Sequence, residues 1–413
     1  MSFIMNIRSV AKYESKILVR SWFFRIFTLL AVVFLGFFNF AMMLMEDNFG
    51  LWFAKSVSSN IPYLNLLLLN TGQAVVAVFL SSEFLKRDKK LDTSEVFYVR
   101  PLSNAEYVVG KIWGNLRVFL FLNLLVLAIV LAFNFMASGV TVDLPAYLVY
   151  FFLISIPTLI FIIGLSIFLM LLLKNQALTF ILLLGYIGLT LFYIQDKFYY
   201  LFDYMVYNLP LFKSTIVGFS NLELILNHRA IYFFAGLGFI FFTIFLFKRL
   251  PNARRSHYPW LFLSFCMFLL MVTAGFRHVR SILWEGEMRA LYTSINNKYV
   301  YEPKMAIDYY DISVEQKSET IRSVVGMEGT ALAASEVFIF CLNPGLRVEE
   351  VKDGEKSLNF KREEQILAVD FGRKIEKGDT ISFSVSYEGR IKDDFCYLDI
   401  PEEVLQQPHD KEM

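Results

Sequence analysis

The chain has 413 residues, of which 56% are hydrophobic, 17% aromatic and 19% charged, and its formal net charge is +1. Soluble globular domains usually contain about 45–50% apolar and about 25% charged residues, so this composition excludes an ordinary soluble protein. Residues 1–276 carry 21 Lys and Arg against 12 Asp and Glu, whereas residues 277–413 carry 18 against 26. The acidic second part is not a nucleic-acid-binding arm, and no nucleic-acid partner is expected.

Residues 1–21 predict an amphipathic helix that lies on a membrane surface, because apolar and charged side chains separate onto two sides of a helix. The apolar side contains Ile7, Val10, Ala11, Ile17 and Leu18. No small-residue cleavage site stands between this segment and the long apolar stretch after it. We therefore expect the segment to be retained and not removed as a signal peptide.

Residues 22–276 predict a polytopic α-helical membrane bundle. A helix that crosses a bilayer needs about 20 predominantly apolar residues. Seven stretches meet this requirement: 22–45, 61–85, 113–136, 146–173, 176–194, 230–247 and 259–276. The weakest is 176–194, which is short and follows the preceding stretch after only Lys174 and Asn175. These two residues form a tight helical hairpin, or the fifth span is shallow.

The distribution of Lys and Arg predicts the orientation of the bundle. If the N-terminus is inside, seven spans place seventeen of these residues on the cytoplasmic side and four on the other side: Lys55, Lys197, Lys213 and Arg229. Because positive residues concentrate in cytoplasmic loops, the sequence predicts a multi-pass protein of the cell (inner) membrane with a cytoplasmic N-terminus and an extracytoplasmic C-terminal domain. The aromatic stretch 195–229 then lies at the outer surface, where we expect re-entrant or interfacial helices.

The segment 81–112 joins the second and third spans on the predicted cytoplasmic side and is too long for a simple turn. Thr93-Ser94-Glu95 predicts the start of a short helix, and the apolar patch Val96–Val99 follows. Arg100-Pro101 breaks this helix, and Ser103 caps the next one. We expect a short helix parallel to the membrane surface, which can transmit force from a soluble partner to the spans on either side.

This segment resembles the first cytoplasmic loop of type-2 ATP-binding cassette (ABC) exporter permeases, in which an acidic residue and an apolar patch precede a Pro-Leu-Ser turn and a Gly-Lys pair. The matching residues are Glu95, Phe97, Pro101, Leu102, Ser103, Tyr107, Gly110 and Lys111. Residues 9–27 are similar to the elbow helix of the same family, with Glu14 and Arg20 at matching places. The resemblance covers residues 5–250. It implies that the loop docks on a separate ABC ATPase subunit, which binds the ATP, and that two permeases pair, as a homodimer or with a second permease.

We expect seven residues of this loop to couple the chain to the ATPase: Glu95, Phe97, Arg100, Pro101, Ser103, Gly110 and Lys111. Plainer interpretations stay open: Glu95 and Arg100 are solvated charges, and Gly110 allows close helix packing while Lys111 anchors the helix at the interface. The chain has no Gly-x-x-x-x-Gly-Lys-Ser/Thr loop to bind ATP itself, so no cofactor is expected in it.

Five polar residues lie at membrane depth in the predicted spans: Asn39, Asn70, Gln73, Asn123 and Asn134. We interpret them as hydrogen-bonding residues between helices; the alternative is that they line a pathway for an unknown substrate. No Asp, Glu or Lys occurs at the middle of a predicted span, which argues against an ion-coupled transporter.

From residue 299 the apolar period changes to two, which predicts a small antiparallel β-sandwich-like domain over 299–400, after a connector over 277–298 and before a polar tail over 401–413. The expected strands are 306–316, 337–342, 346–351, 356–363, 365–371 and 379–389. Hairpins are expected at Asn343-Pro344-Gly345, Asp353-Gly354 and Lys377-Gly378-Asp379. Cys341 and Cys396 lie in separate expected strands, as a disulfide or as free thiols.

The tail resembles the N-terminal β-domain of the aminopeptidase N class of zinc metallopeptidases, through the runs AIDYYDISVEQKSETI, LNPGLRVEEVKDGEKSLNFKREEQILAVDF and KGDTISFSVSYEGRI. That class binds zinc through His-Glu-x-x-His and a later Glu. The histidines here, His228, His257, His278 and His409, do not have this spacing. Neither a metal site nor enzymatic activity is therefore expected.

Together these patterns predict the membrane-spanning permease subunit of an ABC transporter, an exporter by its resemblance, driven by a separate ATPase through the loop 81–112. Two alternatives stay open. In one, the spans only display the β-domain, and the protein is a membrane-anchored binding or scaffold module. In the other, the chain is the N-terminal fragment of a permease–aminopeptidase fusion, an arrangement known for the two families.

Overall fold

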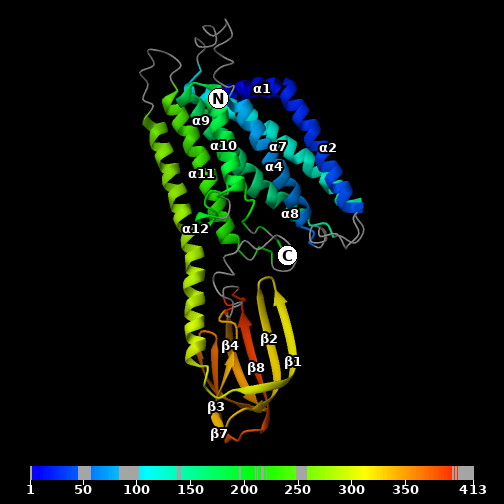
Figure 1. The fold of residues 1–413 in the computed structure, drawn as a ribbon, viewed down its shortest axis with the longest axis vertical. Helices are drawn as coiled ribbons and strands as arrows, with labels where there is room; N and C mark the ends of the chain where they lie inside the picture. Colours follow the sequence, from blue (N-terminus) through cyan, green and yellow to red (C-terminus); the bar gives the residue numbers. More distant parts are fainter. Residues whose placement is uncertain are drawn as a thin grey trace. The chain divides into compact units, whose positions relative to one another are not determined.

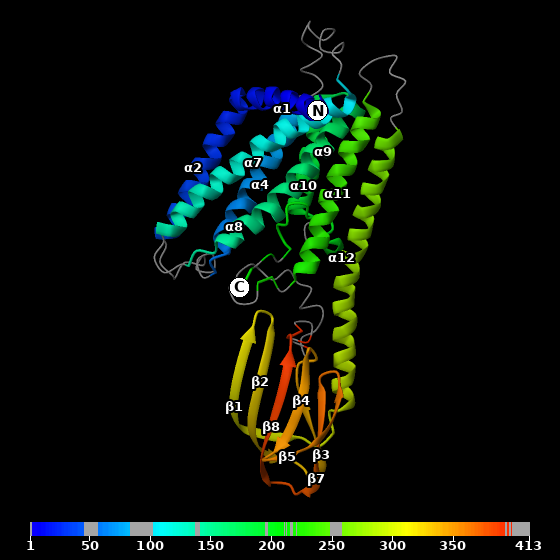
Figure 2. The same cartoon turned by 180° about the vertical axis from the view of Figure 1, so that it is seen from behind.

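The computed structural model describes residues 2–44, 57–82, 102–136, 141–194, 197–209, 211, 213–214, 218–219, 221–247, 258–392, 395 and 398. The chain divides between Val279 and Arg280 into two compact units. The first unit is helical, and the second contains antiparallel β-sheets (Figure 1 and, from behind, Figure 2). A helical bundle followed by a β-domain is therefore confirmed.

The first unit is built from long apolar helices. They are α1 (Ser2–Arg20), α2 (Trp22–Leu44), α4 (Asn60–Ser82), α7 (Asn104–Met136), α8 (Leu144–Tyr150), α9 (Ile156–Leu173), α10 (Gln176–Phe192), α11 (Leu222–Leu246) and the first part of α12 (Tyr258–Lys298). A single π-helical turn, Phe151–Ser155, joins α8 to α9. Among the described residues, six helices are long and apolar enough to cross a membrane, when α8, the π turn and α9 count as one.

The fifth expected span, 176–194, corresponds to α10, which has 17 residues and is shorter than the six helices long enough to cross a membrane. Lys174 has a left-handed φ of 53° and ends α9, and the side chain of Asn175 accepts a hydrogen bond from the Leu178 N–H at 3.2 Å. This αL cap followed by an N-cap makes a tight turn between α9 and α10, as in the hairpin that was one of the two alternatives expected there.

Several boundaries differ from the predicted ones. The helix α7 begins nine residues before the expected 113 because Ser103 caps it, and α11 begins eight residues before 230. The connector expected over 277–298 is helical and continues α12, since its Leu, Glu, Met, Ala and Arg residues favour helix and it has no Pro. The helix continues through the change from apolar to charged residues there.

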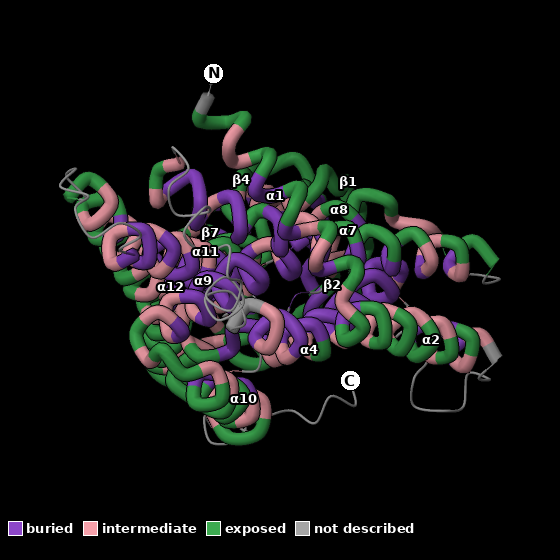
Figure 3. Tube along the Cα trace, turned by 90° about the horizontal axis from the view of Figure 1, so that it is seen from above, coloured by how far each residue is buried: buried purple, intermediate pink, exposed green. Residues whose placement is uncertain are grey.

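The core of the helical unit lies around α4, α7 and α9. About two thirds of the apolar window of α4 is buried, against 17% for α2 and 11% for α12. Figure 3 shows the same contrast, with buried residues concentrated in α4 and α9 and exposed residues along α2 and α10. A helix that is apolar on its exposed side faces lipid or another apolar chain.

The expected re-entrant or interfacial helices over 195–229 are not formed by the described residues. That stretch contains one short 3₁₀ turn, Phe198–Tyr200, whose three residues all have φ between 53° and 61°. Residues 222–229 instead form the first two turns of α11. The aromatic residues that suggested a surface position are partly core residues, because Tyr204 is fully buried.

The second unit has two antiparallel sheets. Its strands are β1 (Met305–Lys317), β2 (Thr320–Ala331), β3 (Ser335–Cys341), β4 (Leu346–Asp353), β5 (Lys356–Ser357), β6 (Asn359–Glu363), β7 (Ile366–Ile375) and β8 (Thr380–Gly389). One sheet has the order β1-β2-β8-β4-β5 and the other β3-β7-β6. Phe371 of the smaller sheet packs against Phe383 of the larger one, with ring centroids 5.5 Å apart, so the two sheets share a core.

The strand β2 was not predicted, and two of the three expected hairpins are wrong. Gly326 and Gly329 interrupt the alternation in β2, which concealed it in the sequence. Asp353-Gly354 does join the paired strands β4 and β5. The other two turn signals carry the chain from one sheet to the other, because β3 pairs with β7 while β8 pairs with β2 and β4. Cys341 is a free thiol, and Cys396 lies outside the described residues.

The last turns of α12 belong to the second unit and pack on the turn between β6 and β7. The fully buried Gln365 donates from Nε2 to the Tyr292 carbonyl at 2.7 Å and to Asn296 Oδ1 at 2.9 Å. The Tyr299 hydroxyl donates to Glu363 at 2.5 Å, and Lys298 Nζ lies 2.9 Å from both oxygens of the same carboxylate.

Candidate functional site

The expected coupling segment is only partly covered by the described residues. Glu95, Phe97, Arg100 and Pro101 lie outside them, so their roles stay predictions. The described part starts at Leu102. Ser103 is the N-cap of α7, and Gly110 and Lys111 lie within that helix.

A reciprocal capping box begins α7. The Glu106 N–H donates to Ser103 Oγ at 3.1 Å, and the Ser103 N–H donates to Glu106 Oε2 at 2.6 Å. This arrangement satisfies two backbone donors that a helix start otherwise leaves unpaired. Asn6 of α1 donates to the other oxygen of Glu106 at 2.9 Å. The cap expected at Ser103 is confirmed, and through Glu106 it also holds α1.

Gly110 lies where α1 and α7 touch. A Cβ at this position would stand 2.7 Å from Val10 Cβ, closer than real Cβ atoms come. Four residues later a Cβ at Gly114 would stand 2.7 Å from Glu14 Cβ and 2.9 Å from the Ala11 carbonyl. The pair forms a small-xxx-small surface that lets two backbones approach closely. The packing interpretation of Gly110 is therefore supported, and Gly114, which the sequence analysis did not single out, has the same role.

Lys111 is not an interfacial anchor. Its side chain is 1% exposed, and Nζ lies 2.7 Å from Glu14 Oε1, whose side chain is also buried. Lys111 Nζ also lies 5.1 Å from the Tyr107 ring centroid, within cation–π range. A buried charge is tolerated only when it is paired, so this ion pair fixes the position of α1 along α7.

Six residues after Lys111, nearly two helical turns further, Arg117 strengthens the same contact. Its Nε donates to Ser15 Oγ at 2.5 Å and its NH2 group to the Ala11 carbonyl at 2.7 Å, while Ser15 Oγ donates to the Gly114 carbonyl at 2.7 Å. Arginine can bridge both acceptors because its guanidinium presents several donors in one plane.

The start of α7 is also tied to the end of α11. The ring of Tyr107 stacks on Phe247 with centroids 5.5 Å apart, and Asn104 Nδ2 donates to the Phe247 carbonyl at 2.6 Å. Residues 103–117 therefore connect α1, α7 and α11. We call this set of contacts the α1–α7–α11 joint. It has no reactive chemistry of its own, and what it can do is transmit displacement.

The polar residues at membrane depth bond to each other. Asn123 Nδ2 donates to Gln73 Oε1 at 2.8 Å, Ser155 Oγ donates to Asn123 Oδ1 at 2.8 Å, and Gln73 Nε2 donates to Asn70 Oδ1 at 2.6 Å. All four side chains are fully buried. The network joins α4, α7 and the π turn, which supports the interpretation as interhelical hydrogen bonding.

The other two of the five polar residues, Asn39 and Asn134, also form hydrogen bonds between helices. Asn39 of α2 exchanges hydrogen bonds with Asn65 of α4, at 2.7 and 3.1 Å, and Asn134 of α7 donates to the Tyr147 hydroxyl at 3.1 Å. Their buried positions again join neighbouring helices.

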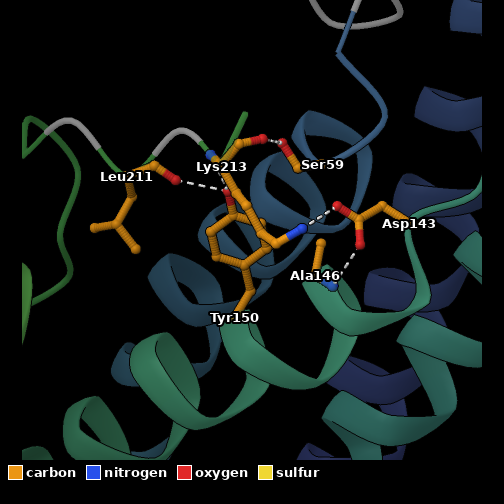
Figure 4. A network of polar contacts seen from close by, with 6 residues as sticks. All are labelled: Ser59, Asp143, Ala146, Tyr150, Leu211 and Lys213. Atoms are coloured by element: carbon orange, nitrogen blue, oxygen red, sulfur yellow. Dashed lines mark hydrogen bonds and ion pairs between the residues drawn. The ribbon is translucent and has the colours of Figure 1, made fainter. Parts of the chain in front are cut away.

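A second set of polar contacts surrounds Lys213 (Figure 4). Lys213 forms an ion pair with Asp143, whose other oxygen caps α8 by accepting from the Ala146 N–H. The Ser59 hydroxyl donates to the Lys213 carbonyl at 2.7 Å, and Tyr150 bonds through its hydroxyl to the Leu211 carbonyl at 2.6 Å. These contacts fasten the segment after α10 to the start of α4 and to both ends of α8.

Arg229 is a buried cation that the sequence pattern did not indicate. Arg229 was expected in a loop, but it lies inside α11 and is 3% exposed. Its guanidinium donates to the Leu153 carbonyl at 2.7 Å, the Tyr204 carbonyl at 2.9 Å and Thr158 Oγ1 at 2.9 Å. The π turn frees carbonyls that a regular helix would use. The sequence feature that could have indicated these free carbonyls is Pro157, just after the π turn. Proline has no backbone N–H to donate to a carbonyl of that turn.

Next to Arg229, the carboxylate of Asp203 accepts the N–H groups of Tyr207, Asn208 and Leu209 at 2.8 to 3.3 Å. Burial raises the pKa of Asp203, and these N–H donors and Arg229 oppose the increase. Among the residues that the structure describes, no group of three or more His, Cys, Asp or Glu side chains could hold a metal ion.

Comparison with known proteins identifies no family for this chain, and it gives a partial structural similarity. No family model matches the chain, and no curated protein matches it. Among solved structures, it is similar to a variant of an M1 zinc metallopeptidase from Deinococcus radiodurans bound to a Tyr-Ser-Ala substrate, with 17% sequence identity and a TM-score of 0.20. The match covers 21% of this chain and 21% of that one, so it spans about a fifth of the length of either protein.

Proposed function

We propose that this chain is the membrane-spanning permease subunit of an ABC exporter and that a separate ATPase subunit drives it through the loop 81–112. The observation that carries the proposal is the α1–α7–α11 joint, where the end of this loop becomes α7. A force applied to the loop reaches α7 through the Ser103–Glu106 capping box, α1 through the Glu14–Lys111 pair, and α11 through Tyr107 and Asn104.

In this proposal Glu95, Phe97, Arg100 and Pro101 contact the ATPase, whereas Ser103, Gly110 and Lys111 transmit its movement. Ser103 is exposed, but its hydroxyl is used to cap α7. For Gly110 and Lys111 the assignment follows from burial. Gly110 and Lys111 are covered by α1 and are not accessible to a soluble partner. Their part in coupling is to make α1 and α7 move together.

We further propose that α10 is a seventh span, so that the β-domain, a small sandwich, is extracytoplasmic. Apolar side chains remain exposed along the whole length of α10: Leu178, Ile181, Leu182, Leu184, Leu189 and Phe192. Lipid contact along both halves of a 17-residue helix favours a crossing over a shallow insertion. With six spans, the β-domain would be on the same side as the loop 81–112. Labelling of single cysteines at Lys89 and Lys377 with an impermeant reagent decides between the two.

Pairing of two permeases, as a homodimer or with a second permease, is part of the same proposal. The exposed apolar face of α2, with Ile26, Val33 and Phe37 each more than half exposed, offers a surface for lipid or for a partner in the membrane. We propose no enzymatic activity for the chain, and we propose that ATP is held by the partner subunit.

The proposal is tested by purifying the tagged full chain from its native membrane and identifying ATP-binding proteins that remain attached. Glu95→Lys and Pro101→Ala are expected to release the ATPase, while Asp88→Lys in the same loop, outside the matching residues, retains it. If no ATP-binding protein is attached to the unmodified chain, the scaffold alternative replaces the permease. A downstream reading frame with His-Glu-x-x-His would identify the chain as part of a permease–aminopeptidase fusion.

A further inference from the structure

A row of basic side chains follows the exposed side of α1. Arg8, Lys12, Lys16 and Arg20 recur every four residues, and all four are exposed. Residues four apart on a helix lie on one stripe, about 6 Å from one another along the axis. We call these four residues the basic row. Their regular spacing gives α1 a continuous strip of positive charge.

The direction of the basic row is fixed by the contacts on the other side of α1. Val10, Ala11 and Leu18 are buried, and Val10 and Ala11 face Gly110 and Gly114 of α7. The Glu14–Lys111 ion pair prevents α1 from rotating about its own axis without burying an unpaired charge. The basic row therefore faces away from the bundle.

Among the residues that the structure describes, no acidic side chain forms an ion pair with the basic row. Glu14 is the one acidic residue among residues 2–44, and it is buried against Lys111. Arg117 adds a further positive charge beside Ser15. The exposed surface of α1 thus carries uncompensated positive charge, which attracts an anionic partner.

Apolar side chains share the surface with the basic row. They are large, and each is 45% to 67% exposed: Phe3, Ile4, Met5, Tyr13 and Val19. A surface that combines Lys and Arg with exposed apolar residues matches the boundary between lipid headgroups and acyl chains. The acidic surface of a soluble protein would match the charges but would leave the apolar residues without a partner.

The junction of α1 with α2 places the helix at that boundary. Only Ser21 separates the two helices, and its N–H remains bonded to the Ile17 and Leu18 carbonyls at 3.0 Å. Trp22, which is 76% exposed, lies under the guanidinium of Arg25 at 5.8 Å. A Trp–Arg pair at the start of an apolar helix is typical of the membrane interface. The basic row therefore ends within one turn of the bilayer surface.

We propose that α1 is a binding site for the headgroups of anionic phospholipids, held by Arg8, Lys12, Lys16 and Arg20. The site rests on the helices lying in a bilayer and does not depend on an ATPase partner or on transport. Phosphate groups along one leaflet approach the row from the side opposite α7, and Phe3, Met5 and Tyr13 enter the acyl region beside them. Each basic residue near an anionic surface contributes about fivefold in affinity.

The test uses the full chain in nanodiscs of phosphatidylcholine with one fifth phosphatidylglycerol. Native mass spectrometry counts the anionic lipids that stay bound after gentle release. The variant Arg8→Gln/Lys12→Gln/Lys16→Gln/Arg20→Gln is compared with Arg347→Gln/Lys361→Gln/Arg373→Gln/Lys377→Gln, which removes the same charge from exposed positions in the β-domain. Thermal unfolding in pure phosphatidylcholine discs verifies that both variants are folded.

We expect the unmodified chain and the β-domain variant to retain phosphatidylglycerol in excess of its bulk share, and the α1 variant to lose that excess at least tenfold. The excess also falls when the salt concentration rises from 50 to 500 mM, because exposed charges are screened. Equal retention by the α1 variant and the control overturns the proposal. The proposal is also overturned if the α1 variant keeps its lipids but loses an attached ATPase. That result would assign the basic row to a protein partner.

Discussion

Lys111 Nζ lies 2.7 Å from Glu14 Oε1 across the contact between α1 and α7, and both side chains are almost completely buried. Removing one member of a buried pair leaves the other charged and unpaired, which typically costs about 3–5 kcal/mol. We therefore expect Lys111→Met and Glu14→Leu each to lower the free energy of unfolding by about this amount. Unfolding of the purified chain in detergent, followed by circular dichroism, measures the change.

The double variant Glu14→Leu/Lys111→Met is expected to recover most of the loss, since two apolar side chains leave no buried charge. Lys12→Met, on the exposed side of α1, serves as the control and should change stability little. Single variants that cost no more than Lys12→Met would contradict the role of the ion pair.

The two glycines of α7 give a second prediction. Gly110→Ala and Gly114→Ala introduce a Cβ 2.7 Å from an atom of α1, and overpacking of this kind costs about 1–3 kcal/mol. Gly185→Ala and Gly188→Ala in α10 are matched controls, because no atom lies within 4 Å of the added Cβ. The controls should gain about 0.5–1 kcal/mol from lower backbone entropy in the unfolded state. The free energy of unfolding should therefore fall in the two α7 variants and rise in the two α10 variants. Equal changes in both pairs would mean that α1 does not pack on α7 as described.

The buried polar network gives a third prediction. Asn123→Leu removes the partner of Gln73 and Ser155 and should cost about 1–3 kcal/mol through unsatisfied polar groups. Thr71→Val is the control, since Thr71 Oγ1 bonds to Leu67 of its own helix at 2.9 Å. If the network only joins helices, ATP hydrolysis by the proposed complex of this chain with an ATPase subunit, per folded molecule, remains unchanged in Asn123→Leu. A selective loss of hydrolysis or transport without loss of stability would favour a pathway lining instead.

A fourth prediction concerns acid and the end of α12. Hydrogen bonds from Tyr299 and Lys298 hold the pKa of Glu363 below its ordinary value. A lowered pKa in the folded state stabilises the fold above the pKa of the unfolded chain, and this contribution is lost as pH falls through the folded pKa. We expect the β-domain to lose a small part of its stability below about pH 4.

The carboxyl carbon resonance of Glu363, assigned by its absence in Glu363→Gln, measures this pKa directly. Tyr299→Phe should move the midpoint up toward the ordinary value, while Tyr301→Phe, whose side chain is 97% exposed, should leave it in place. An unchanged midpoint in Tyr299→Phe would show that the hydroxyl does not stabilise the carboxylate.

The sequence predicted the helical bundle because membrane spans need nothing beyond their own apolar length. The predicted N-terminal boundaries of α7 and α11 were wrong, because buried polar residues such as Glu106 and Arg229 were interpreted as loop residues. Their burial depends on partners far away in the chain: Asn6 for Glu106, and the π turn for Arg229. A pattern of apolar residues cannot show a polar side chain that is buried by a distant acceptor.

The β-domain shows the same limit. Turn residues predict where a strand ends, but Asn343-Pro344-Gly345 and Lys377-Gly378-Asp379 connect different sheets, since strand pairing is decided by the shared core around Phe338, Phe371 and Phe383. At the candidate site, Gly110 and Lys111 were noted individually. Their common contact with α1 could not be derived, because the crossing of two helices is absent from the spacing along either one.

The crossing of α1 over α7 also restricts how this protein can evolve. Positions 10 and 110 cannot both carry a Cβ at the present separation, and a carboxylate at 14 requires a cation at 111. Drift at either helix must therefore be matched at the other: a related chain that has lost Gly110 should have glycine at position 10, and one without Lys111 should lack the acid at 14. In an alignment of homologous sequences, this constraint would be seen as covariation between the first twenty residues and residues 110–114.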